Sequence, residues 1–321
     1  MRAFLLLASL TLAACTTSRA PEDSSDWFGD FEEFDVEDPV LFTDVPYEDP
    51  MYTDGIGQMR NQGLFNGFGF GLSRKYAAGE VIPNTNCTWE NLDSDDDRLP
   101  NEFWAMVTIH PRYYYKNEGC QPRTINGVPV TTETYDSEEK YYGNFFIEDA
   151  SGGLFVLNDS KVAHFNMGDR VRIRVRGVGS RFDLDAVVAH DIVEVDHGPH
   201  PIFFTPNSTT TCSGVPASFD SSDPEQLAAF GERNVECEFD DTSLLGRTVR
   251  VEGKVLSSPD TFGGFFVEDA NGDIVQVSLD SEINRRKWSW PVGSQVRVTG
   301  PVLNAFGHSI AIMRVGQVES L

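Results

Sequence analysis

A ten-residue segment occurs twice in this chain, and this repeat constrains the fold more than any other feature. GNFFIEDASG at residues 143–152 returns as GGFFVEDANG at residues 263–272, an offset of 120 residues. In each copy a short run of aromatic and β-branched residues meets an Asp-x-x-Gly turn, and a second such run follows. Each copy therefore predicts a β-hairpin, and the self-similarity predicts two related units.

The similarity extends to a later strand in each unit. MGDRVRIRVRG at residues 167–177 parallels VGSQVRVTG at residues 292–300, and in both a glycine turn enters a run that alternates apolar and polar residues. No long amphipathic helical pattern interrupts the units. The remaining strands are expected at residues 104–109, 145–147, 154–157 and 186–195 in the first unit, and at 249–255, 265–267, 274–277 and 309–318 in the second.

Five short strands in each unit predict an all-β chain of two tandem small antiparallel barrels. The pattern resembles the OB-fold, and tandem OB-fold lipoproteins of Gram-negative bacteria are similar; the specific part is the repeated G-x-F-F-[IV]-E-D-A-x-G. We expect the first barrel at residues 85–198, a Pro/Gly-containing linker at 199–204 and the second barrel at 205–321. The first unit departs from the pattern by a polar insertion at 111–140, and a β-sandwich is the alternative architecture.

The first residues resemble the signal peptide of a bacterial lipoprotein. Arg2 precedes an apolar run from Phe4 to Leu12, and the Leu-Ala-Ala-Cys that ends at Cys15 is similar to a lipobox. The run is shorter than the ~20 apolar residues that span a bilayer. The resemblance implies that residues 1–14 are removed, that Cys15 carries acyl chains such as palmitate, and that the chain is anchored in the cell envelope, at the outer membrane.

Residues 15–84 are expected to form a largely disordered acidic tether between the lipid and the barrels. Residues 21–54 contain 13 acidic residues and no Lys or Arg, and repulsion between like charges extends such a segment. Aromatic residues are interspersed among the acids, which resembles segments that dock on a partner groove. A docking segment is therefore the alternative to a plain spacer.

Four cysteines remain after Cys15. They are Cys87, Cys120, Cys212 and Cys237. An even number in an exported chain predicts two disulfides, and three connectivities are open. Proximity along the chain favours Cys87–Cys120 and Cys212–Cys237, with one bridge in each unit. The wide spacing disfavours a zinc–thiolate site.

Arginines alternate with apolar residues on one predicted strand and would project from one face of it. These residues are Arg170, Arg172, Arg174 and Arg176. OB-folds use such faces, together with aromatic side chains such as those of Tyr113 and Tyr115, to bind single-stranded nucleic acid. The other interpretation is a structural face on which acidic residues of neighbouring strands pair with the arginines. The net charge of −25 disfavours polyanionic partners.

Alternating acidic residues before the first barrel strand resemble a calcium-binding loop. The oxygen-bearing side chains are those of Asp93, Asp95, Asp97 and Asn101. Calcium prefers hard oxygen ligands at such spacing. The segment departs from the pattern at Arg98, where a glycine is needed, and at Trp104, where an acid is needed. A solvated acidic turn is the alternative, and no other cofactor is expected.

Motifs of the common enzyme classes are absent from the sequence, including H-x-x-x-H, G-x-S-x-G and the phosphate-binding loop. We therefore expect no enzymatic activity. The first hypothesis is a lipid-anchored envelope module that binds or scaffolds a protein or glycan. The alternative is an OB-fold binder of single-stranded nucleic acid or acidic oligosaccharide through the Arg170–Arg176 face, and nucleic acid is the less favoured partner. The oligomeric state stays open.

Overall fold

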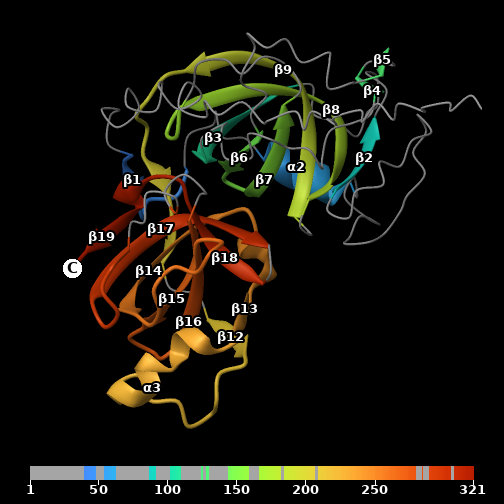
Figure 1. Ribbon diagram of the computed structural model, residues 1–321. Helices are drawn as coiled ribbons and strands as arrows, with labels where there is room; N and C mark the ends of the chain where they lie inside the picture. The colour runs from blue at the N-terminus through green and yellow to red at the C-terminus, as the bar shows by residue number, and fades with distance from the viewer. Residues whose placement is uncertain are drawn as a thin grey trace, which may run out of the picture. The chain divides into compact units, whose positions relative to one another are not determined.

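A computed structural model provides the structure of the chain. It describes residues 40–47, 54–62, 87–91, 102–109, 124–125, 128–129, 144–158, 166–181, 184–206, 209–279, 284, 289–304 and 307–321. Most of these residues are in strands, and the two α-helices are short (Figure 1). The all-β prediction is therefore confirmed. Within the described residues, no helix has both the length and the apolar character needed to cross a membrane.

Six strands form the sheet of the first repeat. They are β2 (Cys87–Asn91), β3 (Phe103–Ile109), β6 (Asn144–Asp149), β7 (Gly152–Asn158), β8 (Arg170–Arg181) and β9 (Leu184–Asp196). The sheet order is β2-β8-β3-β6-β7-β9, and β8 also pairs with β9. That additional pairing closes β3, β6, β7, β8 and β9 into a ring. Strand β2 pairs with β8 and is not part of the ring.

Seven strands form the sheet of the second repeat. They are β11 (Thr205–Pro206), β14 (Thr248–Val255), β15 (Gly264–Asp269), β16 (Ile274–Leu279), β17 (Gln295–Asn304), β18 (His308–Ile312) and β19 (Val318–Ser320). Pairing of β14 with β17 closes the five strands from β14 to β18. The closing strand expected at 309–318 is divided, because β18 ends at Ile312 and β19 returns to pair with β17.

The two sheets share one pattern of strand pairing. The five ring strands are, in chain order, β3, β6, β7, β8 and β9 in the first repeat and β14 to β18 in the second. In each ring, the first strand pairs with the second and with the fourth, the second also pairs with the third, and all of these pairings are antiparallel. The third and fifth strands pair in parallel. The fourth and fifth strands are antiparallel. This is the pairing expected of an OB-fold-like barrel, and it explains why the repeated hairpin lies on the second and third strands of both sheets.

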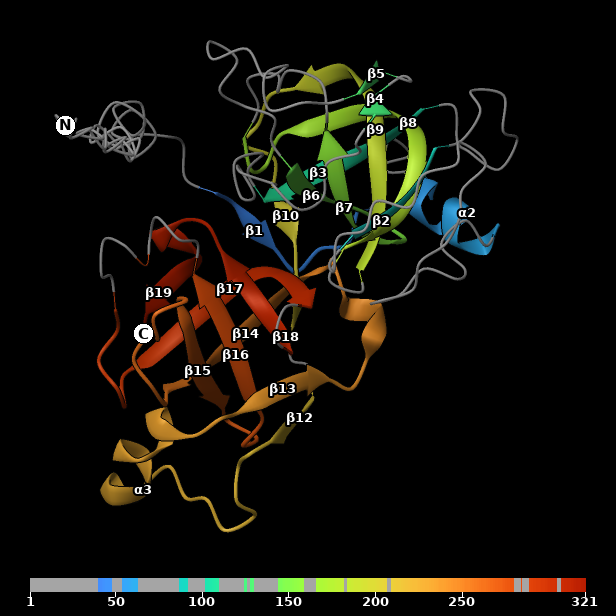
Figure 2. The same cartoon turned by 45° about the vertical axis from the view of Figure 1, so that its right-hand side comes forward.

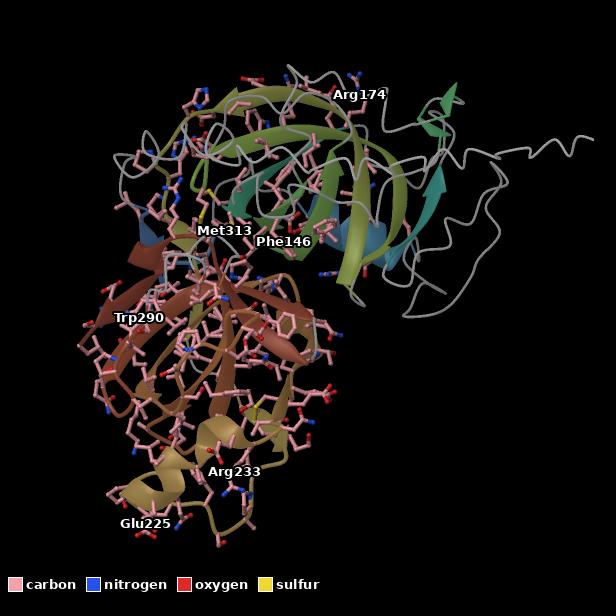
Figure 3. All side chains as sticks on the ribbon, viewed as in Figure 1. Phe146, Arg174, Glu225, Arg233, Trp290 and Met313 are labelled. Atoms are coloured by element: carbon pink, nitrogen blue, oxygen red, sulfur yellow. A yellow bond between two sulfur atoms is a disulfide. The ribbon has the colours of Figure 1, made fainter. Side chains whose placement is uncertain are left out.

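Alternation along the repeated strand divides its side chains between two faces. Phe145 and Ile147 lie in the core of the first repeat, and Phe265 and Val267 lie in the core of the second. Trp290, which Figure 3 labels, stacks on Phe265, and their ring centroids lie 5.6 Å apart. The intervening residues of each strand therefore point to the outer face of the sheet.

Two described pieces of the expected tether are folded. Strand β1 (Phe42–Thr43) pairs in parallel with β10 (Ile202–Phe203) in the linker between the repeats (Figure 2). Helix α2 (Gly55–Asn61) inserts Ile56 and Met59, both fully buried, into the core of the first repeat. The boundary expected at residue 85 therefore omits a helix that belongs to the first core.

An additional segment precedes the second barrel. It contains β12 (Thr210–Ser213), α3 (Pro224–Ala228) and β13 (Glu236–Phe239), together with the 3-10 turns Phe230–Glu232 and Thr242–Leu244. Strands β12 and β13 form an antiparallel hairpin in which Cys212 lies opposite Cys237. Two further short strands, β4 (Thr124–Ile125) and β5 (Val128–Pro129), pair inside the polar insertion of the first repeat.

Candidate binding surfaces

The arginine face of β8 is paired with acidic residues. Arg172 contacts Glu102 at 3.0 Å and Glu194 at 2.7 Å, and Arg174 contacts Glu102 at 2.6 Å. Arg170 forms an ion pair with Asp196.

Strand register explains these pairs, because β9 places Asp196 opposite Arg170 and Glu194 opposite Arg172. Arg174 projects outward from β8 in Figure 3. The side chain of Arg176 and both predicted tyrosines, Tyr113 and Tyr115, lie outside the described residues. The described part of this face is thus the ion-paired structural surface that the sequence left as the alternative.

One of the two predicted disulfides is present. Cys212 and Cys237 are bridged across the β12–β13 hairpin. The backbone of Cys87 is in β2, but its side chain, Cys120 and Cys15 lie outside the described residues. The second bridge and the lipidation site remain predictions.

The predicted calcium ligands, Asp93, Asp95, Asp97 and Asn101, also lie outside the described residues. In the part of the chain that the structure describes, no three His, Cys, Asp or Glu side chains are grouped as metal ligands. The calcium site therefore remains a prediction.

The loop between β14 and β15 presents an aromatic side chain to solvent. Phe262 is 86% exposed, whereas the aromatic residues of the adjoining strand β15 are buried or half-buried. Asp260 holds the loop, because its Oδ1 accepts hydrogen bonds from the backbone N–H of Phe262 at 2.7 Å and of Gly264 at 2.8 Å. Gly263 has a φ of +91°, which glycine adopts without strain.

A second segment holds the same loop from the other side. The Asn284 side-chain amide donates to the carbonyl oxygens of Thr261 at 3.1 Å and Asp260 at 3.4 Å. Phe262 was not among the site residues predicted from the sequence. A signal existed, since the repeat aligns Phe262 with Tyr142, and both precede the glycine that opens the repeated motif.

The repeated Glu-Asp turn of the first repeat is a contact point for two distant segments. Asp149 Oδ1 accepts from the backbone N–H of Ser151 at 2.7 Å and of Gly152 at 3.0 Å, while Oδ2 accepts from the backbone N–H of Ile56 at 2.9 Å. The first two bonds close the turn locally, and the third attaches the first turn of α2. Burial raises the pKa of Asp149.

Glu148 of the same turn contacts the second repeat. Its side chain is fully buried, and Oε2 accepts from the backbone N–H of Thr248 at 2.9 Å. Arg247 Nη1 lies 3.5 Å from the other carboxyl oxygen. Burial raises the pKa of Glu148 to about 8, against the opposing influence of the Thr248 hydrogen bond and the Arg247 charge.

The corresponding turn of the second repeat has different partners. Asp269 Oδ1 accepts from the backbone N–H of Asn271 at 2.8 Å and of Asp273 at 2.9 Å, so the local closure is kept. Glu268 accepts a hydrogen bond from the Ser221 hydroxyl and lies 3.7 Å from Lys254 Nζ. Both partners of Glu268 come from the second repeat and the segment before it.

The comparisons with known proteins identify no family for this chain. No protein-family model matches the sequence, and no curated protein matches it. One similar solved structure is described as "Crystal structure of the tetrameric p202 HIN2", with 11% identity, a TM-score of 0.27, and coverage of 75% of this chain and 100% of that chain. Another, described as "Structural mimicry for functional antagonism", has 11% identity, a TM-score of 0.25, and coverage of 68% and 91%. TM-scores this low do not define a shared fold.

Proposed function

We propose that the protein is a non-catalytic, lipid-anchored module of the cell envelope that binds a protein partner through the loop of Phe262. The observation that carries this proposal is the combination of 86% exposure of an aromatic side chain with a loop held by hydrogen bonds from both sides. An exposed phenyl ring gains free energy when a partner pocket removes it from water. Aromatic anchors of this kind dominate the energetics of many interfaces.

Rigidity of the loop supports the same proposal. A flexible loop loses conformational entropy when it binds, and this loss reduces affinity. The Asp260 and Asn284 contacts fix the backbone around Phe262 before any partner arrives. The ring is therefore presented in a binding conformation at little additional cost in free energy.

The membrane attachment rests on the resemblance of residues 1–15 to a lipoprotein leader. Acylation of Cys15 with several chains would hold the module at the membrane far more firmly than a single chain. Attachment to one membrane keeps the module close to partners in the same membrane, which raises their effective concentration.

The polyanion-binding alternative is disfavoured by the ion pairs on β8. A nucleic acid or acidic oligosaccharide at this face would have to displace Glu102, Glu194 and Asp196 from the arginines. Three carboxylates beside the same arginines also repel a phosphate or sugar-acid group. We therefore do not assign the binding function to this face.

Site-specific photo-crosslinking in cells tests the binding proposal. A photoreactive phenylalanine analogue replaces Phe262 in the full chain, and a matched analogue replaces Val292, which is 42% exposed. We expect a discrete protein adduct from position 262 in the membrane fraction and none from position 292. Equal adducts from both positions, no adduct, or an adduct only with glycan or lipid would contradict the proposal.

A labelling experiment tests the anchor separately. With Cys15→Ser, the chain is expected to lose the palmitate that the wild-type chain incorporates, because the thiol that would carry the lipid is gone. Equal palmitate incorporation in both chains would refute lipid anchoring at Cys15 and leave the binding proposal to be judged by the crosslinks.

A further inference from the structure

Glu148 is a fully buried carboxyl group at a contact between the two repeats. Its partner across the contact is a backbone amide, that of Thr248, and Gly153 beside it packs against Gly246 so closely that a Cβ on Gly153 would lie 2.0 Å from the Gly246 carbonyl oxygen. The Glu148 carboxyl group is thus removed from solvent at a close contact between the two backbones. One of the two carboxyl oxygens accepts no hydrogen bond.

The charged groups around Glu148 come from each element packed against it. They are Asp149 on the same turn, Arg247 before β14, Arg60 of α2, Asp241 near Arg247, and Arg170 on the strand beyond Met106. Arg60 donates to the Gly153 carbonyl oxygen at 3.0 Å, and Arg247 Nη2 donates to the Ala150 carbonyl oxygen at 3.2 Å. Arg170 is paired with Asp196. Arg247 is therefore the charge placed to stabilise an ionised Glu148, at 3.5 Å and without a hydrogen bond to it.

We propose that Glu148 is a pH-sensitive latch: in its neutral form it keeps the Gly246–Thr248 segment of the second repeat docked on the first, and its ionisation releases that segment. The proposal does not depend on the partner of Phe262. It gives Glu148 a chemical role that Glu268, at the same position in the second copy of the motif, does not share.

The direction of the pH effect follows from the two states of the contact. Docked, Glu148 has a pKa near 8, whereas exposed it would have an ordinary glutamate pKa near 4.5. The docked state therefore binds more protons between these values, so docking is strongest at low pH and weakens as the pH rises through this range. Burial also raises the pKa of Asp149, but its long-range hydrogen bond is to Ile56 of α2 and not to the Gly246–Thr248 segment.

Hydrogen exchange of the full chain tests this proposal. The measured quantity is the protection of the Thr248 backbone amide, which donates to Glu148, corrected for the intrinsic pH dependence of exchange, from about pH 6 to about pH 9. We expect protection to fall of the order of tenfold per pH unit below the docked pKa and to level off above it. Glu148→Gln should remove this dependence, because the amide keeps the Thr248 contact without ionising.

Glu268→Gln is the matched control, since Glu268 occupies the same repeat position with partners in its own repeat. This variant should keep the full pH dependence at the Thr248 amide. Protection that does not change with pH in the wild type, or that changes equally in Glu148→Gln, would overturn the latch.

If Glu148→Gln fails to fold, infrared spectroscopy of the wild-type chain decides the matter. A protonated carboxyl band is expected at neutral pH and should disappear above the docked pKa in parallel with the loss of protection. A chain in which no carboxyl group is protonated at neutral pH would also overturn the latch.

Discussion

The two copies of the Glu-Asp-Ala-x-Gly turn have the same local geometry and different surroundings. In both, the aspartate accepts hydrogen bonds from the backbone that follows it, at Asp149 and at Asp269. The first turn also receives α2 and the Gly246–Thr248 segment. The second turn lies mostly exposed, with Ala270 and Gly272 open to solvent.

A repeated motif can therefore keep one residue for local reasons and another for long-range contacts. The aspartate closes the turn in each copy, which turn geometry alone requires. The glutamate lies on the outer face of its strand, where its neighbours decide its chemistry. Glu148 is buried against a backbone amide, whereas Glu268 keeps partial contact with solvent and has a cation and a hydroxyl group for partners.

The outer aromatic residues show the same contrast. Phe146 packs edge-on against Phe155 of the same sheet, at 5.3 Å between ring centroids. Phe266, its counterpart, packs against Phe230 at 5.5 Å, and Phe230 belongs to the segment that precedes the second barrel. In the second repeat, a disulfide-bonded segment therefore helps to cover the outer face.

Removal of the disulfide, which only the second repeat is described as having, is expected to lower the free energy of unfolding the most. Cys212→Ser with Cys237→Ser frees a loop of 25 residues, which should lower the free energy of unfolding by about 3 kcal/mol through the greater entropy of the unfolded chain. Urea unfolding in the oxidised state gives the value. The hydrogen-exchange protection of α2, on the first repeat, should remain unchanged. An equal loss of protection in α2 would show that the disulfide-bonded segment stabilises both repeats.

Gly153→Ala should have the next largest effect. The new Cβ would lie 2.0 Å from the Gly246 carbonyl oxygen, and the required backbone shift should cost about 2 kcal/mol. Asp273 is the counterpart in the second repeat and already carries a side chain, so Asp273→Ala should cost about 0.5 kcal/mol or less. Thermal unfolding of both variants measures the difference, and equal losses would contradict close docking at Gly153.

Asp149→Asn is expected to cost about 1.5 kcal/mol, because the carboxylate bonds to Ile56 and to the turn lose their charge. Asp269→Asn weakens only the local bonds in the same way and should cost about 0.5 kcal/mol. Hydrogen exchange in residues 55–61 distinguishes the two, since only Asp149→Asn should expose α2. Unchanged protection in both variants would show that α2 docks through Ile56 and Met59 alone.

Lys254→Met should have the smallest effect, about 0.5 kcal/mol or less, because its ammonium group lies 3.7 Å from Glu268 near the surface. Methionine preserves the apolar stem, so the variant removes mainly the charge. The loss should shrink at high salt. A larger loss of unfolding free energy that does not depend on salt would show that the Lys254–Glu268 pair behaves as a buried contact, as at Glu148, and not as a surface ion pair.

The barrels were predictable because their signals are local. Alternation along 171–175, the Gly-led turns and the repeated hairpin each require only neighbouring residues, and the structure places strands there. Helix α2 was missed because seven residues carry too little helical periodicity, and its stability comes from Ile56 and Met59 in the core.

The candidate binding site shows the same limit. Exposure of Phe262 depends on Asp260 and on Asn284, which is more than 20 residues further along the chain, and no local pattern reports such contacts. The ion pairs of Arg172 likewise depend on Glu102, 70 residues away, which only strand order brings near. Sequence patterning predicted the arginine face and offered its pairing with acidic residues of neighbouring strands, but not which acidic residues these are.

Strand β1 also determines how mechanical load would enter the protein. Residues 41–43 bond to the linker through the Leu41 carbonyl oxygen to Ile202 N–H at 2.8 Å and the Thr43 carbonyl oxygen to Phe204 N–H at 2.9 Å, and Tyr47 Oη accepts from Phe203 N–H at 3.1 Å. Tension on the chain before Pro39 would therefore act first on the junction between the repeats, ahead of α2 and the first barrel. Such tension would have to break these hydrogen bonds, and the packing of Phe42 and Tyr47 against Ile202, before it reached α2.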